Sequence, residues 1–161
     1  MDRLILVRHG ETAYNARGLM NPDSELEASL SADGEAAARR LGRALGHEPI
    51  DAIVTSPRLR ARRTAELLAG RRDVEVRDLD HLAEIRADPA AVIVAVTHNL
   101  PMRMLVNAAG GADPLTGPLR RVPHATRSDL TAAELDAAIE GLAAWASAPG
   151  RPAGGARCAR G

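Results

Sequence analysis

The chain has 161 residues, of which 45% are hydrophobic. It contains no lysine, and its 21 arginines equal its 21 acidic residues in number, so the formal net charge is zero. This length allows one domain with a hydrophobic core, and the neutral balance argues against nucleic-acid or anionic-membrane binding driven by net charge. The longest apolar run, residues 90–96, is too short to span a bilayer. Tyr14 and Trp145 are the only aromatic residues, which excludes aromatic base-stacking platforms. We therefore predict a globular protein without nucleic-acid or membrane partners.

The cysteine content and the N-terminal sequence predict a cytoplasmic location. Cys158 is the only cysteine, so no intrachain disulfide can form, which fits a reducing compartment. An apolar segment begins almost at Met1 with no charged leader before it, and we expect neither a signal peptide nor a membrane anchor.

Short apolar runs alternate with segments of helical periodicity, which is typical of an α/β protein with a mostly parallel sheet. The continuous apolar run at 91–96 suits a central strand that is buried on both faces. The sequence Thr131-Ala132-Ala133-Glu134 is a capping box that opens the last helix. The expected elements, in chain order, are a strand at 3–7, a polar loop at 10–27, a helix capped by Ser31 that runs to Leu45, a strand at 52–55, a helix at 58–69, a short strand at 74–77, a strand at 91–96, a helix at 100–109, an edge strand within 120–130 and a helix from 131 to about 147.

The composition changes near the C-terminus. Residues 149–161 are only Gly, Pro, Ala and Arg apart from Cys158, which predicts a disordered tail. We expect one catalytic domain over residues 1–148, and the chain contains no internal repeat.

The first candidate for chemistry is His9, which directly follows the first apolar strand in the run Arg8-His9-Gly10-Glu11-Thr12. In open α/β sheets, active sites lie at the carboxyl ends of the strands. A neutral imidazole can attack phosphorus if one ring nitrogen is free and the other is held as a donor. The alternative is a histidine that only packs at a strand end.

Arginine side chains at two strand ends are candidates for a phosphate clamp. Arg8 precedes His9, and Arg60 falls in the first turn of the helix that follows the second strand. Two guanidinium groups can hold the oxygens of a phosphoryl group at fixed geometry and stabilise its charge during transfer. His98, after the buried strand, is placed to bind another phosphate oxygen. Its alternative role is capping or packing before the next helix.

A leaving alkoxide needs a proton, and Glu84 is the proposed general acid. Three other carboxylates compete for this role, namely Glu11, Asp78 and Asp80.

Three motifs in this order resemble those of the histidine phosphatase superfamily, in its phosphoglycerate mutase-like branch. They are Arg-His-Gly-Glu-Thr after the first strand, Ser-Pro-x-x-Arg-Ala-x-x-Thr-Ala after the second, and Thr-His after the late buried strand. The likeness extends from residue 3 to about 109 and includes Leu30-Ser31-x-x-Gly34 and Leu82-x-Glu84. The resemblance implies a three-layer αβα sandwich and a reaction that needs no metal and no organic cofactor.

The resemblance also implies roles for single residues. It implies His9 as nucleophile, Glu84 as acid, and a phosphate pocket of Arg8, Arg60 and His98. Asn15 matches a family position near the phosphate, and we also assign Asn99 to the phosphate-binding residues.

The chain departs from the family pattern after Glu84. Residues 85–89 lead almost at once to the buried strand, so the helical insertion that roofs the site in the family is missing. A roof contacts the non-reacting part of a small substrate and excludes water. Without it we expect an open pocket that also admits a bulky or protein-borne phosphoryl group. We further expect residues 78–90 to be the most mobile part of the core.

These observations predict a metal-independent phosphatase acting on phosphomonoesters or protein phosphohistidine through a phosphohistidine intermediate on His9. One alternative is a catalytically weak phosphate-binding or regulatory module on the same fold. Another is a metal site of His9, His98 and a carboxylate, which two neighbouring arginines disfavour. The remaining histidines are interpreted as surface or packing residues, namely His47, His81 and His124.

Overall fold

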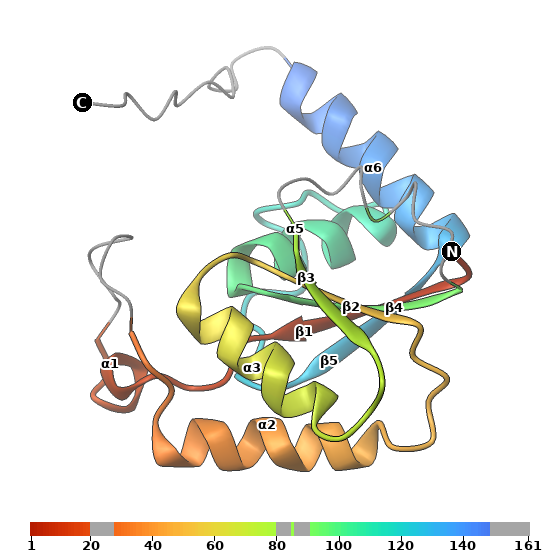
Figure 1. Ribbon diagram of the computed structural model, residues 1–161. Coiled ribbons are helices and arrows are strands. Elements are labelled where there is room, and N and C mark those ends of the chain that lie inside the picture. The colour runs from red at the N-terminus through yellow and green to blue at the C-terminus, as the bar shows by residue number, and fades with distance from the viewer. Residues whose placement is uncertain (20–27, 80–84, 86–90, 149–161) are drawn as a thin grey trace, which may run out of the picture.

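The computed structural model describes residues 1–19, 28–79, 85 and 91–148 (Figure 1). The proposed acid Glu84, the tail at 149–161 and most of the 78–90 segment lie outside these residues. The helices and strands are β1 (Arg3–Arg8), α1 (Ala13–Ala16), α2 (Ala32–Ala44), β2 (Ala52–Thr55), α3 (Leu59–Ala69), β3 (Glu75–Asp78), β4 (Val92–Thr97), α5 (Asn99–Ala109), β5 (Arg127–Thr131) and α6 (Ala132–Ser147).

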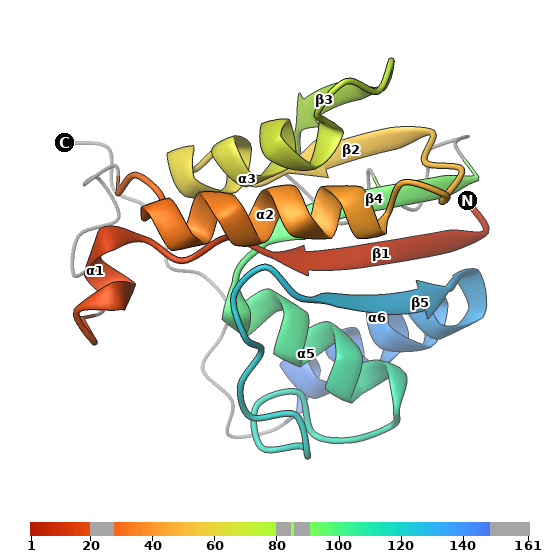
Figure 2. The same cartoon turned by 90° about the horizontal axis from the view of Figure 1, so that it is seen from below.

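The strands form one five-stranded sheet in the order β3-β2-β4-β1-β5 (Figure 2). The first four are parallel, and β5 runs antiparallel to β1 at the edge, as predicted for the last strand. In the register, Arg8 of β1 lies opposite Thr97 of β4, and Thr55 of β2 lies opposite Val96 of β4. The carboxyl ends of these three strands therefore meet at one edge of the sheet.

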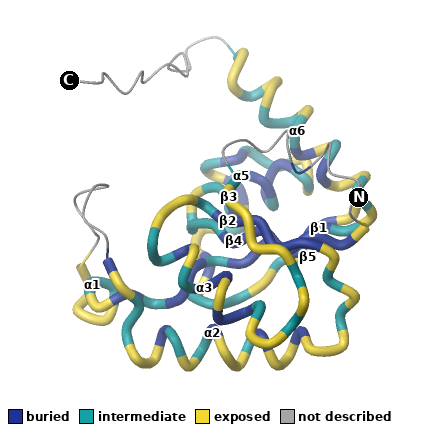
Figure 3. The backbone as a smooth tube through the Cα atoms, viewed as in Figure 1, coloured by how far each residue is buried: buried dark blue, intermediate teal, exposed yellow. Residues whose placement is uncertain are grey.

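Helices cover both faces of the sheet, and the predicted three-layer αβα sandwich is confirmed (Figure 1). Side chains alternate along β1: Ile5 and Val7 belong to the core beneath α2 and α3, and Leu4 and Leu6 to the core beneath α5 and α6. The three inner strands β1, β2 and β4 are the most deeply buried part of the chain, whereas the edge strands β3 and β5 are largely exposed (Figure 3). Each fully buried Leu, Ile or Val side chain contributes about 1.5–3 kcal/mol. The largest of them are aliphatic or Met, which compensates for the scarcity of aromatic residues.

The helix caps predicted at Ser31 and Thr131 are confirmed at the starts of α2 and α6. The Ser31 hydroxyl accepts a hydrogen bond from the Gly34 amide at 3.0 Å, and Thr131 and Glu134 form the capping box of α6. These bonds satisfy amide groups that the first helical turn leaves without partners.

The expectation of a loop throughout residues 10–27 is wrong at α1. Thr12 caps this turn, since its hydroxyl accepts from the Asn15 amide at 3.2 Å while Asn15 Oδ1 accepts from the Thr12 amide at 3.3 Å. The reciprocal pair uses Asn where a capping box normally has Glu or Gln. The segment between β1 and α1 packs against α2, where a Cβ at Gly34 would lie 2.1 Å from the Glu11 carbonyl oxygen. Only glycine permits this approach of α2 to the end of β1.

No helix of the described residues is both long enough and apolar enough to cross a membrane.

Candidate active site

Two histidines meet where β1 and β4 end. The ring centroids of His9 and His98 lie 5.2 Å apart, and the His9 amide donates to the Thr97 carbonyl at 2.9 Å. The parallel pairing of β1 with β4 thus joins two motifs that are far apart in the chain.

The His9 ring is held in one tautomer. Its Nδ1 lies 2.7 Å from the Gly10 carbonyl oxygen, and because a carbonyl only accepts, Nδ1 carries the hydrogen. The side chain is buried, and this burial, together with the nearby His98, Arg60 and Arg8, lowers the pKa of His9 to about 3. The ring is therefore neutral at physiological pH, and its Nε2 carries a free lone pair. This is the state that a nucleophilic histidine requires.

Arg8 and Arg60 bring positive charge close to His9. A terminal nitrogen of Arg8 donates to the Val122 carbonyl, while its buried Nε has no hydrogen-bond partner among the described residues. Burial lowers the pKa of both guanidinium groups, with smaller contributions from other arginines nearby. Arginine stays charged in proteins, and neither side chain pairs with a carboxylate in the described ranges. The site therefore favours an anion.

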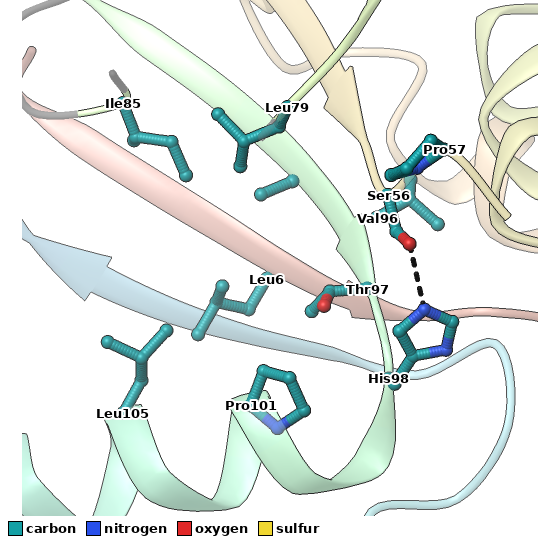
Figure 4. A pocket seen from close by; sticks show the side chains of 11 residues that line it. Leu6, Ser56, Pro57, Leu79, Ile85, Val96, Thr97, His98, Pro101 and Leu105 are labelled. Carbon is teal, nitrogen blue, oxygen red and sulfur yellow. Dashed lines mark hydrogen bonds between the residues drawn. The ribbon is translucent and has the colours of Figure 1, made fainter. Parts of the chain in front are cut away.

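Ser56 orients the second histidine. Its hydroxyl lies 2.9 Å from His98 Nε2, and it follows β2, so a third strand end joins the site (Figure 4). Burial and the nearby Arg60, Arg58 and Arg8 lower the pKa of His98 to about 4. His98 Nδ1 is buried and finds no hydrogen-bond partner in the part of the chain that the structure describes. If the Ser56 hydroxyl donates to Nε2, then Nδ1 carries a hydrogen that can bind an anion.

Thr64 is a residue whose part in the site only the structure shows. It is fully buried in α3, where its hydroxyl accepts from the Gly10 amide at 2.9 Å and donates to the Arg60 carbonyl at 2.7 Å. It therefore ties the His9–Gly10 turn to the helix turn that carries Arg60.

His124, interpreted from the sequence as a surface or packing residue, packs against the proposed nucleophile. Its ring centroid lies 5.4 Å from that of His9, and no described residue forms a hydrogen bond with its buried Nε2. Burial and the charge of Arg8 lower the pKa of His124 to about 4. We call His9, His98 and His124 the histidine cluster. No motif in the sequence points to the third member, which comes from the segment before β5.

Asn15 and Asn99, the two proposed phosphate-binding amides, both line a cavity of about 390 Å³ beside Arg8 and His124. Asn99 Oδ1 accepts from the Val122 amide at 2.8 Å, and Asn15 Oδ1 is used in the cap of α1. The cavity, which we call the basic cavity, is lined by Arg8, Glu11, Asn15, Gly18, Leu19, Asn99, Arg120, Arg121 and His124.

A second cavity of about 340 Å³, which His98 lines, lies over the α5 face of the sheet (Figure 4). Its walls are mainly apolar and include Leu6, Leu79 and Leu105.

No group of three or more His, Cys, Asp or Glu side chains that could hold a metal ion exists within the described part of the chain.

The chain belongs to the histidine phosphatase superfamily (branch 1), whose family model matches residues 4–91. It is 40% identical over 83 residues to adenosylcobalamin/alpha-ribazole phosphatase of Salmonella typhimurium, a match covering 52% of this chain and 40% of that protein. It is 37% identical over 89 residues to phosphoserine phosphatase 1 of Hydrogenobacter thermophilus, covering 53% and 39%. The chain thus matches about two fifths of each of these relatives.

The fold is also that of solved structures. The crystal structure of alpha-ribazole phosphatase from Shigella flexneri superimposes with a TM-score of 0.66 at 19% identity, covering 79% of this chain and 89% of that chain. His98 and His124 lie outside the part matched by the family model, so their approach to His9 comes from the fold.

Proposed function

We propose that the protein is a phosphatase that hydrolyses phosphomonoesters or protein phosphohistidine without a metal, through a covalent phosphohistidine on His9. The observation that carries this proposal is the His9 ring: it is neutral, holds its hydrogen on Nδ1, and leaves the Nε2 lone pair available beside the positive charges of Arg8 and Arg60. The family membership supports the same reaction class.

The first step forms a bond between His9 Nε2 and phosphorus and breaks the bond from phosphorus to the leaving-group oxygen. Arg8, Arg60 and the Nδ1 hydrogen of His98 bind the phosphoryl oxygens, whose charge they stabilise during transfer. The leaving oxygen takes a proton from a carboxylic acid, which we propose on sequence grounds to be Glu84.

The second step regenerates the enzyme. Water attacks the phosphorus of phospho-His9, its proton returns to the carboxylate, and inorganic phosphate leaves with His9 neutral again. The hydrogen bond from Nδ1 to Gly10 stabilises the positive charge that the ring acquires while it carries the phosphoryl group.

The test is hydrolysis of 4-nitrophenyl phosphate in EDTA by the wild type, His9→Ala and His47→Ala. His47 is an exposed histidine and serves as the matched control. We expect turnover in the wild type and in His47→Ala and none in His9→Ala. Acid-labile, base-stable phosphate label on the wild type but not on His9→Ala would identify the intermediate.

Turnover that persists in His9→Ala, or that EDTA abolishes, would refute this mechanism. Phosphate binding without any turnover of esters or phosphohistidine would instead favour the phosphate-binding module.

A further inference from the structure

The turn that carries His124 is tied to the end of β1 by main-chain hydrogen bonds. The Arg8 amide donates to the Thr126 carbonyl at 3.2 Å, and the Ala125 amide donates to the Arg8 carbonyl at 3.1 Å. Ala125 lies in the left-handed region at a φ of 50°. A residue with a Cβ keeps this conformation only where the surrounding structure imposes it, and such positions are common at functional sites. The fold therefore holds His124 in a fixed place beside Arg8 and His9.

His98 and His124 both contact the proposed nucleophile, and each has a buried ring nitrogen that is not used. Their ring centroids lie 5.2 and 5.4 Å from that of His9. The nitrogens are Nδ1 of His98 and Nε2 of His124, and neither has a hydrogen-bond partner within the described ranges of the chain. A buried polar atom without a hydrogen bond is unfavourable, and a ligand can satisfy it. A phosphoryl group on His9 lies next to both rings, so its oxygens can accept from both.

The alternative role of His124 is packing against the His9 ring. A side chain that only fills buried space is normally apolar, because a polar atom without a partner is costly there. The charges around His124 instead favour an anion. Burial and the nearby Arg8 and Arg121 lower the pKa of His124 to about 4, against the opposing effect of Glu11. The ring is therefore neutral without a ligand, and a phosphoryl dianion offsets the arginine charges that it faces.

We propose that His124 is a further phosphate-binding residue, whose Nε2 hydrogen donates to an oxygen of the phosphoryl group on His9. No bond forms between His124 and phosphorus; its role is to hold the phosphoryl group in both steps of the reaction. His124 lies outside residues 4–91, so the family match does not include this contact. The inference rests on the proposed function, because it assumes that the phosphoryl group is bound at His9.

Two substitutions separate hydrogen bonding from packing. His124→Gln keeps a side-chain N–H at nearly the same distance from the main chain as Nε2, whereas His124→Leu keeps a similar volume without a donor. The probe is orthovanadate, which resembles the phosphoryl group in transfer, and calorimetry on the full chain measures its affinity.

We expect the orthovanadate affinity to fall at least about tenfold in His124→Leu, which is typical of a lost hydrogen bond to a charged group, and to stay within about threefold of wild type in His124→Gln. His47→Leu replaces an exposed histidine and is the matched control, which should bind as the wild type does. Both substitutions at His124 remove the ring contact with His9. An equal loss of affinity in both would therefore mean that the ring only packs, and wild-type affinity in His124→Leu would equally overturn the proposal.

A second measurement uses the wild-type protein, so it does not depend on the folding of a variant. In protein labelled with nitrogen-15 at histidine, the NMR signals of the ring nitrogens show which of them carries the hydrogen. Saturating orthovanadate should place the hydrogen of His124 on Nε2 and slow its exchange with solvent, while the signals of His47 stay the same. Signals of His124 that do not change at saturation would refute the proposed contact.

Failure of the proposed function has a different signature, namely no hydrolysis of 4-nitrophenyl phosphate by the wild type. Orthovanadate binding that depends on His124 would then still support His124 as a ligand of the anion. If esters are hydrolysed through His9 but His124→Leu binds orthovanadate like the wild type, only the role of His124 fails. A wild type that binds no orthovanadate would overturn both.

Discussion

Replacing Thr64 by Val tests whether one buried hydroxyl holds the candidate site together. The two side chains have nearly the same shape, so the change removes the hydroxyl and little volume. The Gly10 amide then loses its acceptor at 2.9 Å, while the Arg60 carbonyl keeps the main-chain hydrogen bond of α3. A buried amide without a partner costs about 1–3 kcal/mol, and we expect the free energy of unfolding to fall by that amount.

Thr64→Ser is the matched control, because it keeps the hydroxyl and removes one methyl group at a cost of about 1 kcal/mol. The stabilities of the two variants lie close together, so the distinguishing measurement is kinetic. We expect Thr64→Val to lose at least tenfold in kcat/KM for 4-nitrophenyl phosphate, because His9 is displaced together with its neighbour Gly10 once the hydrogen bond is lost. Thr64→Ser should stay within about threefold of wild type.

Urea unfolding followed by tryptophan fluorescence measures the stability. Trp145 is the only tryptophan and donates to Asp113 Oδ2 at 3.0 Å, far from the substituted position along the chain. If Thr64→Val were as active as Thr64→Ser, or as stable as the wild type, the hydroxyl would not position the turn, and the reasoning would be refuted.

Three further predictions concern close packing, pH and the loop before β5. Gly34→Ala should lower the free energy of unfolding by about 3 kcal/mol or more, because its Cβ would lie 2.1 Å from the Glu11 carbonyl oxygen. Gly141→Ala is the control: its Cβ would lie 3.5 Å from the nearest atom, so the change should raise the free energy of unfolding by about 0.5–1 kcal/mol. Equal effects of the two substitutions in urea unfolding would contradict this prediction. The pKa values of the histidine cluster in the folded protein are about 3 to 4, below the ordinary histidine value of 6.5 that holds in the unfolded chain. The unfolded state therefore binds more protons as the pH falls, and the free energy of unfolding should decrease from pH 7 to pH 5. The decrease should reach up to about 1.4 kcal/mol per pH unit for each histidine. A flat profile in urea unfolding over this window would exclude buried neutral histidines. Asn99→Asp should keep the hydrogen bond from the Val122 amide, so we expect the melting temperature to stay the same. The added negative charge should weaken phosphate binding about tenfold in calorimetry. An unchanged affinity would remove Asn99 from the phosphate-binding residues.

Much of the fold was predictable because its signals are local. The apolar runs at 3–7, 52–55 and 91–96 all form strands, and the hydroxyls of Ser31 and Thr131 cap helices as their positions indicate. These features depend on residues within one or two turns of each other, so the order of amino acids is sufficient to predict them.

Part of the site was predictable for the same reason. His9, Arg60 and His98 each follow a strand or open a helix, and parallel strands bring such positions to one edge. Topology alone does not give the tautomer of His9, because this depends on the distance of 2.7 Å between Nδ1 and the Gly10 carbonyl oxygen.

The sequence by itself determined the strand and helix pattern, the family and the candidate nucleophile, since each is encoded in short runs of neighbouring residues. Only the tertiary structure brought His124 to His9, Ser56 to His98 and Thr64 to Gly10. The residues in these pairs are separated by 42 positions (Ser56 and His98) to 115 positions (His9 and His124) along the chain. Contacts over such separations arise from the pairing of strands and the packing of helices on the sheet, so they exist only in the folded chain.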